Sequence, residues 1–129
     1  MLKIVVRTVP HKQQRYPTCG DWYELKDGTW VITVSEMGDW RYELLIALHE
    51  IVEYSLCKVR KITDREVTRF DKQFERERLA GKQPAHVEPG DDPRCPCVAE
   101  HFFATNIERL LAAELGVKWP VYEMEVELL

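Results

Sequence analysis

Apolar, β-branched runs predict strands in the first third of the chain. Residues 2–9 are rich in Ile, Val and Thr, and two further runs occupy residues 21–26 and 29–34. Asp27-Gly28 separates these two runs, and this dipeptide favours a tight turn because glycine readily adopts positive φ. The pattern predicts an N-terminal antiparallel sheet, built around a β-hairpin, within residues 1–36.

Helical patterns dominate the rest of the chain, with helices expected at 40–60, 64–80 and 98–115. Asp39 is suited to cap the first of these helices, and Gly116 is suited to end the third. Between the second and third helices, residues 81–96 hold four prolines and two glycines, which predicts a long surface loop.

The last residues alternate between apolar side chains and glutamates. A period of two over residues 120–128 predicts a strand with one acidic face. We therefore expect an α+β fold in a single domain, residues 1–129. It comprises a sheet in 1–36, a helical part in 39–116 that includes the loop 81–96, and a C-terminal strand in 120–128.

Composition narrows the class of protein. The chain has 129 residues, with 18 Lys and Arg against 22 Asp and Glu, a net charge of −4 that disfavours general binding to nucleic acids or anionic membranes. No apolar run approaches the ~20 residues of a membrane span, and residues 1–7 are too short and interrupted for a signal peptide. We expect a cytoplasmic protein whose four cysteines are thiols, with no nucleic-acid or membrane partner.

The strongest chemical signal lies in the first predicted helix. On a helical wheel, Leu45, Val52 and Glu53 fall within about 60° of His49, so His49 and Glu53 share a buried face, one turn apart. A buried carboxylate is costly unless it is protonated, paired or bound to metal. Side chains at i and i+4 project side by side, which suits metal chelation.

His49-Glu50-x-x-Glu53 resembles the zincin metallopeptidase signature H-E-x-x-H, with glutamate in place of the second histidine. The resemblance implies that His49 and Glu53 are zinc ligands and that Glu50 is the general base. Glutamate is an established zinc ligand, although its charge would raise the pKa of a bound water. The order of hairpin, motif helix and His-bearing helix is similar to a minimal zincin core. The whole pattern also resembles small uncharacterised proteins of phages and prophages.

A catalytic zinc needs a third protein ligand, and His101 near the start of the third predicted helix is best placed to supply it. Glu108 shares an inward-facing stripe with His101, two turns away. The expected zinc ligands are therefore His49, Glu53 and His101. Glu108 is either an outer partner of one histidine or a replacement for Glu53 as ligand.

The sequence contains two other candidate sites. Cys95 and Cys97, with His86 and His101, could form a structural Cys₂His₂ zinc site, although C-x-C is a tight spacing. The E-x-x-E pair Glu50 and Glu53 is also found in all-α magnesium pyrophosphohydrolases. Those enzymes need a second helical acidic motif, and the loop 81–96 cannot supply one.

The buried His49 and Glu53 predict a metal-binding protein. The resemblance to zincins implies that the ion is zinc and that the reaction is hydrolysis of peptide bonds. An extended peptide or a protein is the expected partner. The alternative is a non-catalytic phage or accessory protein that acts through protein contacts, in which His49 and Glu53 form a polar pair in the core.

Overall fold

A three-stranded mixed sheet forms the N-terminal part of the protein, in a computed structural model that describes residues 1–129. β2 pairs with β3 in antiparallel fashion as the expected hairpin, and Gly28 at its turn has φ +88°. β1 pairs with β3 in parallel, so the expectation of a wholly antiparallel sheet is wrong. The cause is the loop 10–19, which carries the chain past β3 to the far edge of the sheet. The strands are β1 (Ile4–Val9), β2 (Gly20–Glu24) and β3 (Trp30–Ser35).

The three predicted helices form with nearly the predicted bounds: α1 (Trp40–Val59), α2 (Asp64–Leu79) and α3 (Val98–Glu114). The Asp39 side chain caps α1 by accepting a hydrogen bond from the backbone N–H of Arg41. Gly116 follows α3 with φ +69°, a left-handed conformation that ends the helix. Between α2 and α3, the 80–97 loop is irregular apart from one short 3₁₀ turn, η2 (Pro89–Asp91).

The C-terminal strand predicted for 120–128 is wrong, because this segment forms a helix, α4 (Trp119–Glu127). Pro120 lies in its first turn, where proline's fixed φ favours a helix and its missing N–H costs nothing. Trp119, Tyr122 and Val126 lie on one face at helical spacing and pack against the core. The fold remains α+β, with four helices after the sheet.

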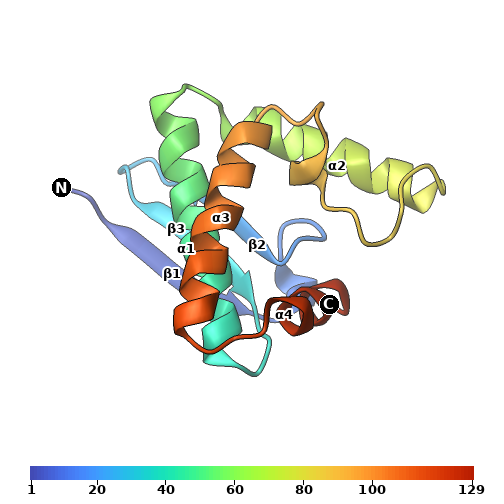
Figure 1. The fold of residues 1–129 in the computed structure, drawn as a ribbon. Helices are drawn as coiled ribbons and strands as arrows, with labels where there is room; N and C mark the ends of the chain where they lie inside the picture. The colour runs from blue at the N-terminus through green and yellow to red at the C-terminus, as the bar shows by residue number, and fades with distance from the viewer.

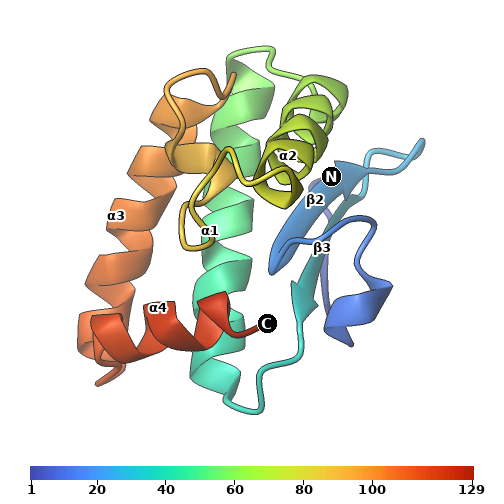
Figure 2. The ribbon, with the colours of Figure 1, turned by 90° about the vertical axis from the view of Figure 1, so that its right-hand side faces the viewer.

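α1 is the central element of the molecule. It packs against β2 and β3 on one side and against α3 on another, as Figure 1 shows. In Figure 2 the 80–97 loop lies in front of the middle of α1 and α4 lies in front of its lower part, between α3 and the sheet.

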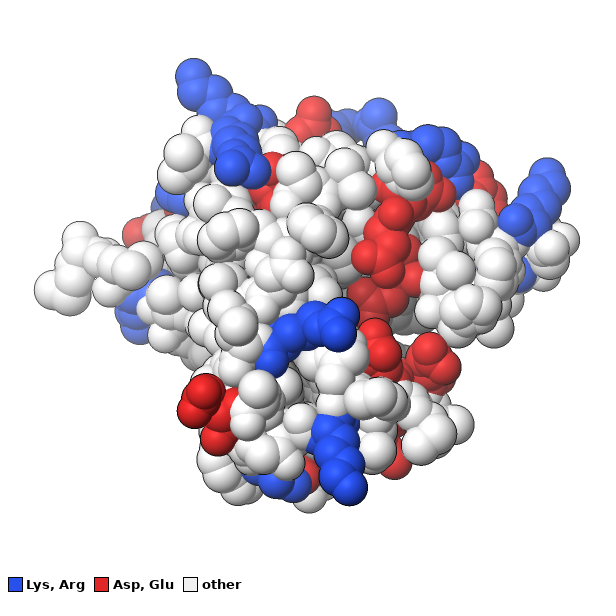
Figure 3. Space-filling view, viewed as in Figure 1, with Lys and Arg blue, Asp and Glu red and all other residues white.

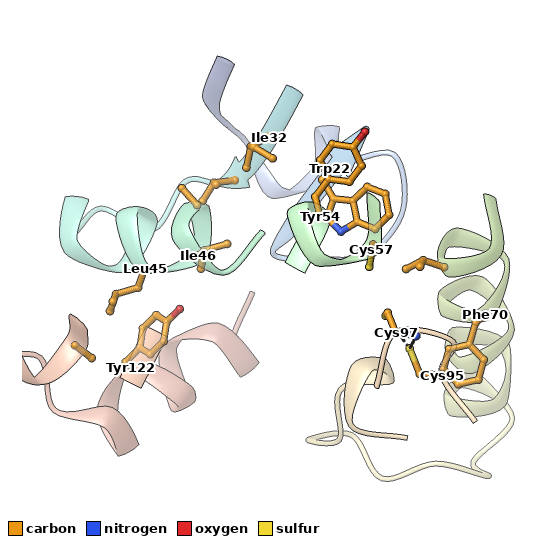
Figure 4. Close-up of a cluster of buried hydrophobic side chains, with 14 of the residues drawn as sticks. Trp22, Ile32, Leu45, Ile46, Tyr54, Cys57, Phe70, Cys95, Cys97 and Tyr122 are labelled. Atoms are coloured by element: carbon orange, nitrogen blue, oxygen red, sulfur yellow. Dashed lines mark hydrogen bonds between the residues drawn. The ribbon is translucent and has the colours of Figure 1, made fainter. Parts of the chain in front are cut away.

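The hydrophobic core runs along α1 (Figure 4). Trp22 of β2 stacks on Tyr54, with ring centroids 4.7 Å apart. At one end of this cluster Cys95 and Cys97 lie beside Phe70 of α2, and these contacts anchor the end of the 80–97 loop. None of the helices has the length and apolar character required to cross a membrane.

Candidate metal centre

Four polar side chains are buried where α1 and α3 pack together. The exposed fractions are 7% for His49 and 6% for Glu53 on α1, and 9% for His101 and 7% for Glu108 on α3. The helical wheels therefore predicted the inward direction of all four correctly. Burying an isolated charge costs several kcal/mol. Buried polar groups of this kind must therefore form hydrogen bonds or ion pairs with one another, or bind a ligand.

Three of these side chains converge on one point. Glu53 Oε2 lies 3.0 Å from His49 Nε2 and 3.0 Å from His101 Nδ1. The two nitrogens are 3.1 Å apart, although the residues are 52 positions apart in the sequence. The structure thus brings together the three residues predicted as metal ligands.

The spacing of these atoms fits a metal ion. Donors bound ~2.1 Å from a tetrahedral ion lie about 3.4 Å from one another, and the observed separations are slightly shorter. Two imidazoles and one carboxylate are also a donor set found in catalytic zinc sites. The His49, Glu53 and His101 group could therefore hold a metal ion.

Glu108 has a different role from Glu53. Its Oε1 lies 2.8 Å from His49 Nδ1, the ring nitrogen that faces away from the cluster, and its Oε2 accepts a hydrogen bond from Tyr122. Glu108 therefore orients His49, while Glu53 is the carboxylate that faces both histidines. Trp22 Nε1 donates to Glu53 Oε1 at 3.2 Å and fixes the orientation of that carboxylate.

Burial and hydrogen bonding shift the pKa values of His49, Glu53 and His101 in opposite directions. Burial alone would lower the pKa of His49, but hydrogen bonds to Glu108 and Glu53 raise it to about 10. For Glu53, burial favours protonation, and hydrogen bonds from the two histidines outweigh it and hold its pKa well below the usual range. The pKa of His101 is raised, because pairing with Asp91 and Glu53 outweighs its desolvation.

Glu50, the predicted base, is half-buried beside the cluster. It lies so close to Gly20 of β2 that a Cβ at position 20 would be 2.6 Å from Glu50 Oε1. Burial, together with the negative charge of Glu53, raises the pKa of Glu50 well above its ordinary value.

The cluster and Glu50 line a cleft of about 410 Å³. The lining comes from all four α-helices, from β2 and from the 10–19 and 80–97 loops. Arg78 of α2 is its only arginine or lysine among many acidic residues. On the face shown in Figure 3, acidic side chains form a band between α3 and this loop. A negative cleft attracts cations, including metal ions.

The alternative Cys₂His₂ site is wrong. The Cys95 and Cys97 Sγ atoms are 2.9 Å apart, but neither cysteine belongs to a group of donors close enough to share an ion, and His86 is exposed. Both cysteines instead pack in the core.

Three residues near the site were missed in the sequence. Glu88 and Asp91 approach His101 from the 80–97 loop, and Gly90 lies against its ring. Their place in an irregular loop gave no periodicity from which to predict this contact.

The chain matches no protein-family model, no curated protein and no solved structure. The chemistry of the site is therefore the basis for assigning a function.

Proposed function

We propose that this protein binds zinc through His49, Glu53 and His101 and is a zincin-like, metal-dependent hydrolase that acts on peptide bonds. The observation that carries the proposal is the convergence of three donor atoms from two helices, with Glu50 beside them at the wall of the cleft. A bound zinc ion would polarise a scissile carbonyl and lower the pKa of a water molecule.

The residues around the ion have distinct roles in this proposal. Glu50 accepts a proton from the attacking water and passes it to the leaving amine. Glu108 holds the His49 ring in the orientation that leaves Nε2 facing the ion. Glu53, the one carboxylate among the three ligands, adds negative charge, so the water is less acidified than beside a third histidine.

The position of β2 supports a peptide substrate. β2 lies at an edge of the sheet, and Gly20, Asp21 and Trp22 line the cleft. An extended peptide that paired with the free edge of this strand would lie beside Glu50.

The test combines metal analysis with peptide hydrolysis. We expect the wild-type protein, purified without chelators and supplied with zinc, to retain at least one equivalent per chain. His49→Ala and His101→Ala should each lower the bound zinc by at least one equivalent, whereas His86→Ala, which removes an exposed histidine, should leave it unchanged. Glu50→Gln should keep the metal and lose turnover of a mixed peptide library by about 10²–10⁴-fold.

Each outcome bears on a different part of the proposal. A wild-type protein without stoichiometric zinc would refute metal binding and support the alternative, an accessory protein with a polar core pair. Zinc binding with unchanged turnover in Glu50→Gln would exclude Glu50 as the base. Circular dichroism of the histidine variants separates loss of a ligand from loss of the fold.

A further inference from the structure

The outer ring nitrogens of the two histidines differ in their surroundings. His49 Nδ1 has a close carboxylate partner, Glu108, at 2.8 Å. His101 Nε2 is buried and makes no hydrogen bond. Two carboxylates lie near it at longer distances, with Glu88 Oε2 at 3.3 Å and Asp91 Oδ1 at 3.5 Å. His101 Nε2 therefore has only two longer ionic contacts, whereas its counterpart on His49 has one close partner.

The turn that carries the two carboxylates is fitted closely to the ring of His101. Gly90 lies between them in η2, and a Cβ at this position would be 2.4 Å from His101 Cγ and Nδ1. Gly90 does not have positive φ, so close approach rather than backbone conformation requires glycine here. The close contact of Gly90 with the ring holds the turn, and with it Glu88 and Asp91, near Nε2.

The three outer donors have the chemistry and spacing of a cation site. Glu88 Oε2, Asp91 Oδ1 and His101 Nε2 all lie within 4.8 Å of one another. Donors on one divalent ion lie roughly 3.0–3.5 Å apart, and the separations of 3.3 and 3.5 Å from Nε2 match this range better than a hydrogen bond. The side chains of Glu88 and Asp91 are 52% and 61% exposed, so an ion and its remaining waters can reach them.

We infer that Glu88, Asp91 and His101 Nε2 form a second site for a divalent cation, so that His101 bridges two ions. The bridge rests on the proposed function, which assigns His101 Nδ1 to the first ion. When the second ion binds, the imidazole releases its remaining proton to water, and each ring nitrogen then donates a lone pair to one ion. The carboxylates of Glu88 and Asp91 supply two negative charges to balance the second ion.

Zinc stoichiometry tests the second site. We expect the wild-type protein to retain two equivalents after zinc loading and gel filtration, and Glu88→Gln/Asp91→Asn to retain one. The matched control, Glu75→Gln/Glu123→Gln, removes the same number of carboxylates from the lining of the cleft and should retain two.

Copper provides a second readout that does not depend on activity. Two copper(II) ions bridged by one imidazole ring couple magnetically. The electron paramagnetic resonance signal of the doubly loaded wild type should therefore fall well below that of two isolated ions. Glu88→Gln/Asp91→Asn should give the full signal of one isolated ion.

The outcomes separate this inference from the proposed function. One equivalent in both the wild type and the double variant would overturn the second site and leave the first intact. No bound zinc in the wild type would overturn both. Loss of both ions from Glu88→Gln/Asp91→Asn would also overturn a separate second site, because the carboxylates would then serve the first.

Discussion

Gly20 and Gly90 show how single residues shape the candidate centre. Each lies against a side chain of the proposed site, Glu50 or His101, at a distance that leaves no room for a Cβ. Neither has positive φ, so the requirement for glycine comes from the neighbouring side chain. The backbone of β2 and of η2 thus forms part of the wall around the site.

A double-mutant cycle tests the contact between Gly20 and Glu50. The Cβ of Gly20→Ala would lie 2.6 Å from Glu50 Oε1 and 2.7 Å from Ile46 Cγ2, so we expect a loss of about 1–3 kcal/mol in the free energy of unfolding. In a Glu50→Ala background the same substitution should cost less, because the carboxylate is gone. Denaturant unfolding of the four proteins measures the coupling, and additive effects would show that Gly20 does not position Glu50.

The sequence predicted the burial of the candidate site residues well where they lie on helices. The 3.6-residue period assigned His49, Glu53, His101 and Glu108 to buried faces, which their exposures confirm. It could not decide whether Glu53 or Glu108 faces both histidines, because that choice depends on how α1 and α3 are aligned. Side-chain contacts between two helices are set by their packing, which the pattern of either helix alone does not contain.

Elements were predicted best where a local signal marks their ends. The caps at Asp39 and Gly116 mark the beginning of α1 and the end of α3. The segment 120–128 was predicted as a strand because an alternation over only seven residues fits the two-residue period of a strand as well as the 3.6-residue period of a helix. Pro120, which suits the first turn of a helix, was the signal that pointed to α4. The direction of β1 could not be predicted, since hydrophobic periodicity does not distinguish parallel from antiparallel pairing.

α2 is tied to the loop 10–19 by a hydrogen bond with a predictable pH dependence. Tyr16 donates to Asp71 Oδ2 at 2.8 Å. Burial, with the negative charges of Glu53 and Asp21, raises the pKa of Asp71 to about 7, although Tyr16 and the charge of His101 lower it. In the unfolded chain the same carboxyl ionises near pH 4. Between these two pH values the carboxyl ionises more readily in the unfolded chain than in the folded protein, which favours unfolding. The contribution of Asp71 to the free energy of unfolding is therefore fully present below about pH 4 and is lost as pH rises to about 7.

Asp71→Asn isolates this effect, because its amide oxygen still accepts from Tyr16 and cannot ionise. Relative to the wild type, the variant should gain on the order of 2–4 kcal/mol in the free energy of unfolding as pH rises from 4 to 7. Urea unfolding of both proteins across this pH range measures the difference between their free energies of unfolding. The other carboxyls titrate in both proteins, so their contribution to this difference largely cancels. A difference that does not change with pH would mean that Asp71 ionises normally in the folded protein.

At the scale of the whole molecule, the candidate centre exists only when the chain is folded. Its three donors come from α1 and α3, which are separated in sequence by α2 and the 80–97 loop. The same two helices carry much of the core, so the contacts that bring the donors together are those that hold the fold. A ligand that binds the native state and not the unfolded chain adds its binding free energy to stability.

Zinc should therefore raise the thermal stability of the entire protein. At a free zinc concentration 100 times the dissociation constant, the gain is about 3 kcal/mol, which corresponds to a rise of roughly 10 °C in Tm for a chain of this size. Differential scanning calorimetry with zinc and with a chelator measures the shift. In His49→Ala, which leaves Glu53 and His101 without the third donor, the rise in Tm should be clearly smaller than in the wild type. An equal shift in the wild type and in this variant would place the stabilising zinc elsewhere, because only binding at this cluster depends on His49.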